Sequence, residues 1–111
     1  MTAQPFDFTE ISSLEKALAL FQMGKLEKLY LFPPEFGGKD TPQNMMYVPP
    51  GIAEIKRRID AMIGSMAKDG LVSKYVAEPE YKGASFIPSK IKIQASHPDK
   101  PSTVNPTINI W

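Results

Sequence analysis

The chain has no cysteine and only one histidine among its 111 residues. Disulfides and cysteine-ligated zinc are therefore excluded, and a metal site would have to rest on carboxylates and that one imidazole. No apolar run approaches the roughly 18 residues that indicate a membrane span. The first residues also lack the basic and apolar stretches of a signal peptide. We therefore expect a cytoplasmic protein that carries no cofactor.

An excess of charge of either sign is also missing, because 13 basic residues face 12 acidic ones. Nucleic-acid-binding proteins usually show a clear basic excess, so neither nucleic acid nor a membrane is an expected partner. The composition, 42% hydrophobic and 23% charged, is typical of a globular domain. The length predicts a single domain over residues 1–111. Residues 1–11 read as an irregular lead-in, whose Phe6, Phe8 and Ile11 can pack against the body.

Two segments have helical periodicity. The first begins near Ser12, where Ser12 to Glu15 fit a capping box, and ends at Gly24. Its apolar stripe consists of Leu14, Ala17, Leu18 and Phe21. The second helix begins after Pro50 and ends at Gly70. Its stripe consists of Ile52, Ile55, Ile59, Met62, Ile63 and Met66, which predicts a core-facing side, and Glu54 with Arg58 forms an ion pair on the far side.

Strand signals fill most of the remaining sequence. They fall at residues 28–32, 45–48, 71–77, 86–96 and 107–111, whereas residues 97–102 have the composition of a turn. The resulting order is α-β-β-α-β-β-β. It predicts an α+β fold with an antiparallel sheet of four to five strands and both helices on one face.

Motifs for catalysis are weak. His97 stands in a turn without a plausible partner for acid–base work. The segment from Gly37 to Thr41 resembles a phosphate-binding loop only superficially, because it lacks the leading glycine and the hydroxyl residue after the lysine. Lys56, Arg57 and Arg58 point in different directions around the second helix, which favours an ordinary solvated face. We therefore expect a binding protein and not an enzyme.

The segment between the first two strands, residues 33–44, is the strongest candidate for a binding site. A structureless loop of this length is uncommon in a compact domain and is often functional. Glu35, Phe36 and Asp40 lie in it. Three further residues join them as candidate contacts: Glu78, Glu80 and Trp111. Trp111 alternates with Ile110 and should face outward if Ile110 faces the core. An aromatic residue beside acidic ones is typical of a protein interface.

Several stretches resemble small bacterial proteins encoded beside toxins of interbacterial competition. They are Leu31 to Asp40, Asn44 to Pro49, Glu78 to Gly83 and Phe86 to Pro88, which together span about half of the chain, from residue 31 to residue 88. The resemblance implies an immunity-type protein, which binds a cognate toxin and blocks it. The acidic loop could then occupy a basic cleft if the toxin is a nuclease. Two alternatives remain open: a small ligand-binding or enzymatic domain that uses the 33–44 loop, and a structural or adaptor subunit.

Overall fold

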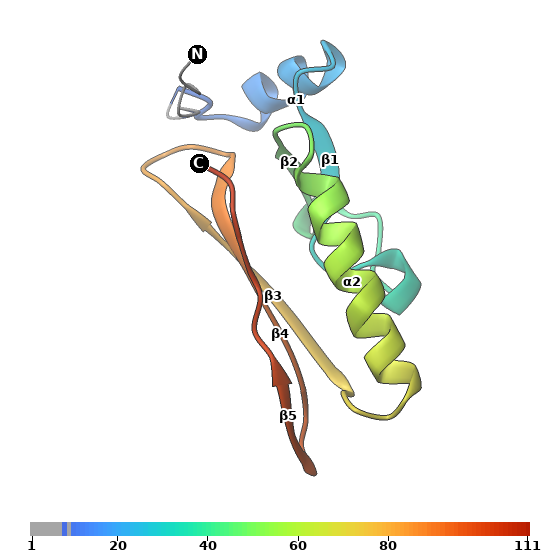
Figure 1. Ribbon diagram of the computed structural model, residues 1–111. Coiled ribbons are helices and arrows are strands. Elements are labelled where there is room, and N and C mark those ends of the chain that lie inside the picture. Colours follow the sequence, from blue (N-terminus) through green and yellow to red (C-terminus); the bar gives the residue numbers. More distant parts are fainter. Residues whose placement is uncertain (1–7, 9) are drawn as a thin grey trace, which may run out of the picture.

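The computed structural model describes Phe8 and residues 10–111 (Figure 1). The helices are α1 (Leu14–Gln22) and α2 (Ile52–Lys68). The strands are β1 (Glu27–Tyr30), β2 (Met45–Val48), β3 (Lys74–Tyr81), β4 (Pro88–His97), β5 (Lys100–Val104) and β6 (Thr107–Asn109). The α+β class and the predicted order of elements are confirmed, with β5 as an additional strand in a region expected to be a turn.

The strands form two antiparallel sheets and not one continuous sheet. β1 and β2 make a hairpin, and β3 to β6 make a four-stranded sheet. In the larger sheet β4 pairs with β3 along one edge and with β5 and β6 along the other. Pro33-Pro34 and Pro49-Pro50 follow β1 and β2, and prolines end a ladder because they donate no backbone hydrogen bond. The hairpin therefore stays short.

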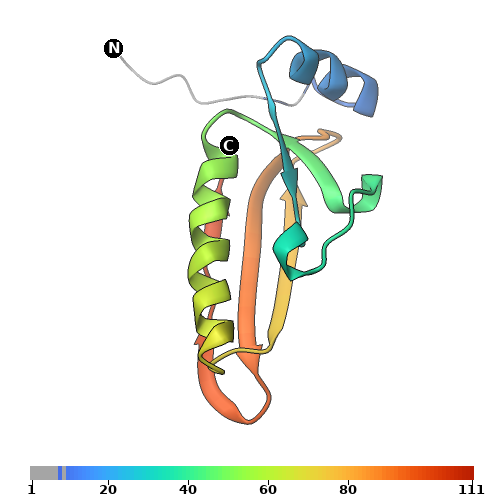
Figure 2. The same cartoon turned by 90° about the vertical axis from the view of Figure 1, so that its right-hand side faces the viewer.

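The hairpin and α2 lie side by side in front of the larger sheet (Figure 2). α2 contacts both β1 and β6, so it spans from the hairpin to the far edge of that sheet. The main core lies between these two layers. It includes Val48 from β2, Ile63 from α2 and Ile91 from β4, all nearly inaccessible to solvent.

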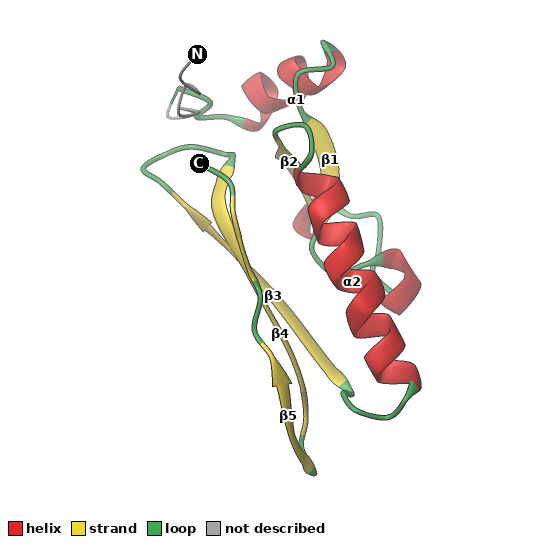
Figure 3. Cartoon of the chain, in the orientation of Figure 1, coloured by secondary structure: helices red, strands yellow, loops and turns green. Residues whose placement is uncertain are grey.

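α1 covers a second, smaller core at one end of the molecule (Figure 3). Ser13 caps this helix by accepting a hydrogen bond from the Lys16 amide. Ala17 is buried there with Leu26 and Ile87. Phe8 and Ile11 pack against the same cluster, as predicted for the lead-in, whereas Phe6 lies outside the described residues.

The predicted apolar stripe of α2 faces the core only in part: Ile63 is buried and Ile52, Ile59 and Met66 pack against the core, but the other two members do not. Ile55 and Met62 were expected to be buried, yet each is 46% exposed. Lys56 and Asp60 are buried instead, on the same side as Ile63. The expectation that Lys56 lies on a solvated face is therefore wrong. Likewise, Leu18 of α1 is 38% exposed, because Ala17 is the residue of that helix that enters the small core.

Candidate functional site

The 33–44 connection is folded and is not the structureless loop that its composition suggested. It contains two short 3₁₀ turns, Pro34–Phe36 and Pro42–Asn44. The Asn44 side chain ties the segment together, since its amide donates to the carbonyls of Phe32 and Lys39 at 2.9 Å each and its oxygen accepts from the Phe32 amide at 2.8 Å. The connection therefore has a fixed shape before any partner arrives.

Gly38 allows the close approach that this shape requires. A Cβ atom at this position would lie 1.8 Å from the Phe32 carbonyl oxygen, far inside van der Waals contact. The Gly38 amide also donates to the Pro33 carbonyl. This glycine thus holds the two ends of the first 3₁₀ turn together.

A buried polar network lies beneath this connection. The Lys56 ammonium donates to Asp60 Oδ2 at 2.6 Å and to the Tyr75 hydroxyl at 3.1 Å. The Tyr75 hydroxyl in turn donates to Asp60 Oδ1 at 2.6 Å. The side chains of Lys56 and Asp60 are 3% and 6% exposed. The network therefore joins α2 to β3 in the interior of the molecule.

The environment changes the titration of two members of the network. Burial holds the pKa of the Lys56 ammonium below its ordinary value, and its hydrogen bond to Asp60 opposes this change. Burial raises the pKa of the Tyr75 hydroxyl well above its ordinary value, and the neighbouring Asp60 carboxylate acts in the same direction. Tyr75 therefore remains neutral and available as a hydrogen-bond donor throughout the physiological range.

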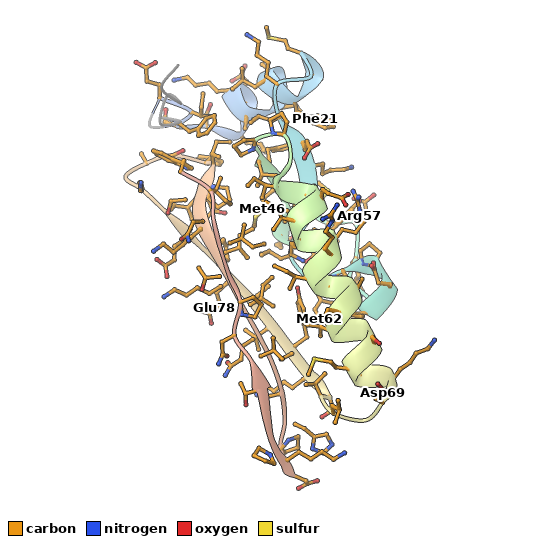
Figure 4. The ribbon with its side chains drawn as sticks, viewed as in Figure 1. Phe21, Met46, Arg57, Met62, Asp69 and Glu78 are labelled. Atoms are coloured by element: carbon orange, nitrogen blue, oxygen red, sulfur yellow. The ribbon has the colours of Figure 1, made fainter. Side chains whose placement is uncertain are left out.

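A polar cleft opens on one side of the connection. Its volume is about 280 Å³, and Asp60 and Lys56 contribute to its lining. Pro33, Pro34 and Glu35 form the wall on the side of the connection, and Arg57 lies opposite on α2. Figure 4 shows Arg57 near the start of α2. Because Lys28 and Arg57 also line it, this cleft is not acidic.

An apolar groove of about 470 Å³ opens on the other side. Phe32, Phe36 and Tyr75 form a ring cluster at this groove, with centroids 5.4 to 6.3 Å apart and edge-on geometry. Ile63 and Ala67 of α2 line the side opposite. Gly64 leaves room for Phe36, since a Cβ atom there would lie 3.3 Å from the Phe36 ring.

The structure divides the residues that the sequence proposed as contacts. Glu35 and Phe36 are neighbours in the first 3₁₀ turn, but Glu35 lines the polar cleft and Phe36 the apolar groove. Asp40 is exposed and accepts a hydrogen bond from the Tyr30 hydroxyl at 3.1 Å. Glu78 lies on the outer face of the larger sheet, away from α2 (Figure 4). Glu80, two residues further along β3 and on the same face, pairs with Lys92 at 2.7 Å. The acidic residues therefore do not form one surface.

Trp111 does not face outward as its strand parity suggested. It is half-buried and packs against both cores. Its indole N–H donates to the Ile87 carbonyl at 3.0 Å, and the Lys82 ammonium lies 4.9 Å from the ring centroid. The side chain thus has intramolecular contacts on several sides.

A second apolar surface lies beside α1 and reaches the end of the 33–44 connection, since Pro42 is part of its lining. Leu14 and Leu18 of α1 border a groove of about 320 Å³ together with Tyr81 and Phe86. These four side chains are 38% to 54% exposed. Aromatic residues that are partly exposed at a groove are typical anchors of protein interfaces. This surface is therefore an alternative to the groove at Phe32, Phe36 and Tyr75 as a site of partner binding.

Sequence reasoning missed the central role of Lys56, Asp60 and Tyr75. A signal was present, since Lys56 and Asp60 are spaced i,i+4 and lie beside Ile63 on the helical wheel. Over the described residues no cluster of three or more potential metal-ligating side chains occurs. In the same part of the chain, neither helix is long and apolar enough to cross a membrane.

Comparisons with protein-family models, with curated proteins and with solved structures gave no match.

Proposed function

We propose that the protein acts by binding another protein, as a cytoplasmic immunity-type inhibitor of a bacterial toxin, and that it uses the 33–44 connection. The observation that carries this proposal is the fixed shape of the connection. Asn44 and Gly38 hold it in place. Glu35 within the connection and Phe32 just before it are both exposed to solvent. A surface that is already ordered loses less conformational entropy on binding, which favours affinity.

The charges around the connection are not those expected of an acidic loop that enters a basic toxin cleft. Glu35 shares its cleft with Lys28, Lys56 and Arg57, and Asp40 is engaged by Tyr30. The local charge is therefore balanced, so substrate mimicry toward a nuclease has little support. The ring cluster beside the apolar groove is the better anchor, because aromatic side chains in pockets dominate protein-interface energetics.

The proposal is tested by co-expression with the product of the neighbouring toxin gene. The variant Phe32→Ala/Glu35→Ala changes the presented surface and leaves Asn44 and Gly38 in place. We expect it to bind the toxin at least about tenfold more weakly and to lose protection of cells. The matched control, Leu18→Ala/Phe86→Ala, changes the alternative groove and should protect as the parent does. Undiminished protection by a folded Phe32→Ala/Glu35→Ala variant contradicts the proposal.

A second function, the binding of a small polar molecule, is favoured by the network that lines the polar cleft. A lysine ammonium has three hydrogens, and two of those of Lys56 are used by Asp60 and Tyr75. The third has no hydrogen-bond partner among the described residues, and a ligand carboxylate or carbonyl would have to displace part of the cleft wall to reach it, because the Lys56 side chain is 3% exposed. NMR titration with acetate and succinate, with Lys56→Met as control, tests this function. Shifts confined to the cleft in the parent and lost in the variant would support it.

A further inference from the structure

One edge of the larger sheet is open. β3 pairs with β4 along one side, and within residues 10–111 no other strand pairs with it. Its remaining main-chain N–H and C=O groups therefore face away from the sheet. Such an edge is a template on which another chain can form a strand, so proteins usually protect it.

The protection of β3 covers only part of its length. Pro79 removes a donor from the second half of the strand, and Glu78 and Glu80 add charge there. Proline and charged side chains are the devices that blunt an exposed edge. The first part of the strand, together with Ser73 before it (residues 73–77), has no proline and a single charge, at Lys74. The open part of the edge is therefore its N-terminal half.

The apolar groove lies beside this open part. Ser73, Lys74 and Tyr75 line the groove themselves, with the ring cluster on one side and Ile63 and Ala67 on the other. A strand added to residues 73–77 would direct alternate side chains toward the inner face of the sheet, where Tyr75 lies. Those side chains would be next to the groove. An open edge and an apolar pocket thus occur together, which is the arrangement of peptide-binding domains that work by strand addition.

We propose that Ser73 and the first residues of β3, up to Ala77, bind an extended segment of a partner polypeptide as an additional strand, with one apolar side chain of that segment in the groove and an acidic side chain beside Lys74. The acidic preference follows from charge complementarity with Lys74. This residue alternates with Tyr75 along β3, so its side chain stands on the outer face of the sheet, where the neighbour of the apolar residue in an added strand would also point. The inference rests on the proposed function in that the natural segment would belong to the toxin.

The test uses a phage-displayed library of random linear 12-residue peptides selected on the intact protein. We expect the selected peptides to share an apolar residue with an acidic residue near it. A synthetic copy of one such peptide is then added to the labelled protein, and amide hydrogen exchange is followed by NMR. Alternate amides between Ser73 and Ala77 should exchange at least about tenfold more slowly, because alternate N–H groups of a strand point to the same edge.

Two charge-reversal variants distinguish a specific contact of the peptide with Lys74 from a general attraction between the peptide and a positively charged protein. Lys74→Glu should weaken peptide binding about tenfold, whereas Lys25→Glu makes the same change of net charge in the turn after α1 and should leave binding unchanged. A third variant, Ala67→Trp, fills the groove and should also weaken binding. Binding that leaves β3 amides unprotected, or no selected peptide at all, overturns strand addition.

The outcomes also distinguish this inference from the proposed function. Slowed exchange along β3 with a peptide, together with failure of the protein to bind the neighbouring toxin, would keep strand addition and refute the immunity function. A toxin complex in which the amides of residues 73–77 exchange as in the free protein would keep the immunity function and refute strand addition.

Discussion

Removal of the Asp60 carboxylate is the sharpest test of the buried network. In Asp60→Leu the Lys56 ammonium loses its partner at 2.6 Å, and the Tyr75 hydroxyl loses its own acceptor at 2.6 Å. Because the Lys56 side chain is 3% exposed, water does not replace the lost carboxylate. Breaking a buried ion pair in this way costs about 3–5 kcal/mol, which is a large part of the stability of a small domain.

The free energy of unfolding is measured by urea denaturation at pH 7, with circular dichroism as the signal. The double variant Lys56→Met/Asp60→Leu removes both charges and should recover most of the loss, since a well-packed apolar pair often replaces a buried ion pair without penalty. Glu54→Leu is the matched control on the same helix. Glu54 pairs with Arg58 at 3.0 Å on the solvent side, and exposed pairs contribute below about 1 kcal/mol.

A loss below about 1 kcal/mol for Asp60→Leu would refute this reasoning. Such a result would mean that the Lys56 ammonium reaches water in the variant. A double variant as unstable as the single one would refute it too, because the loss would then come from packing and not from an unpaired charge.

Four further outcomes follow from the same structure. Ile63→Ala should lower the free energy of unfolding by about 2–5 kcal/mol, and the exposed Ile55→Ala by less than about 1 kcal/mol. Equal losses in urea denaturation would contradict the observed orientation of α2, in which Ile63 is buried and Ile55 is not. Gly38→Ala should cost at least about 2 kcal/mol, because its Cβ cannot fit 1.8 Å from the Phe32 oxygen, and an unchanged midpoint would contradict the tight turn. The stability that Tyr75 contributes is fully present below the ordinary tyrosine pKa of 10.0 and should decline as pH rises above it, since the unfolded phenol ionises first; a Tyr75→Phe variant should lack this component of the decline in alkaline denaturation. His97, the last residue of β4, accepts a hydrogen bond from the Asp99 amide at 3.0 Å and should be dispensable, so His97→Ala should retain full protection in the co-expression assay.

Local sequence signals predicted the elements well and their contacts less well. The β2 strand and α2 lie within a few residues of their expected positions because proline and glycine mark their ends. β5 escaped detection, since Pro101 lies within it and prolines usually argue against a strand. β5 pairs with β4 alone in the described chain, so it is an edge strand, where proline is tolerated.

The orientation of α2 could not be obtained from periodicity alone. An apolar stripe predicts the side with the most hydrophobic residues, but in this helix Lys56 and Asp60 are buried beside Ile63. Tyr75 is 15 residues beyond Asp60, and nothing local to either residue indicates that they meet. The sequence therefore predicted one part of the candidate site, the 33–44 segment. The other part, the network of Lys56, Asp60 and Tyr75 beneath that segment, became visible only in the tertiary structure.

Trp111 has a consequence for how the chain reaches its folded state. Its ring packs edge-on against Phe8 at 5.7 Å, and it touches both cores, so it couples two regions that share few other side chains. Phe8 and Trp111 are about a hundred residues apart, and closing a loop of that length carries an entropic cost before the contact stabilises anything. On a ribosome, residue 8 emerges long before residue 111. The packing of α1 is therefore complete only after residue 111 has left the ribosome, and folding of this region cannot proceed steadily from the first residues onward.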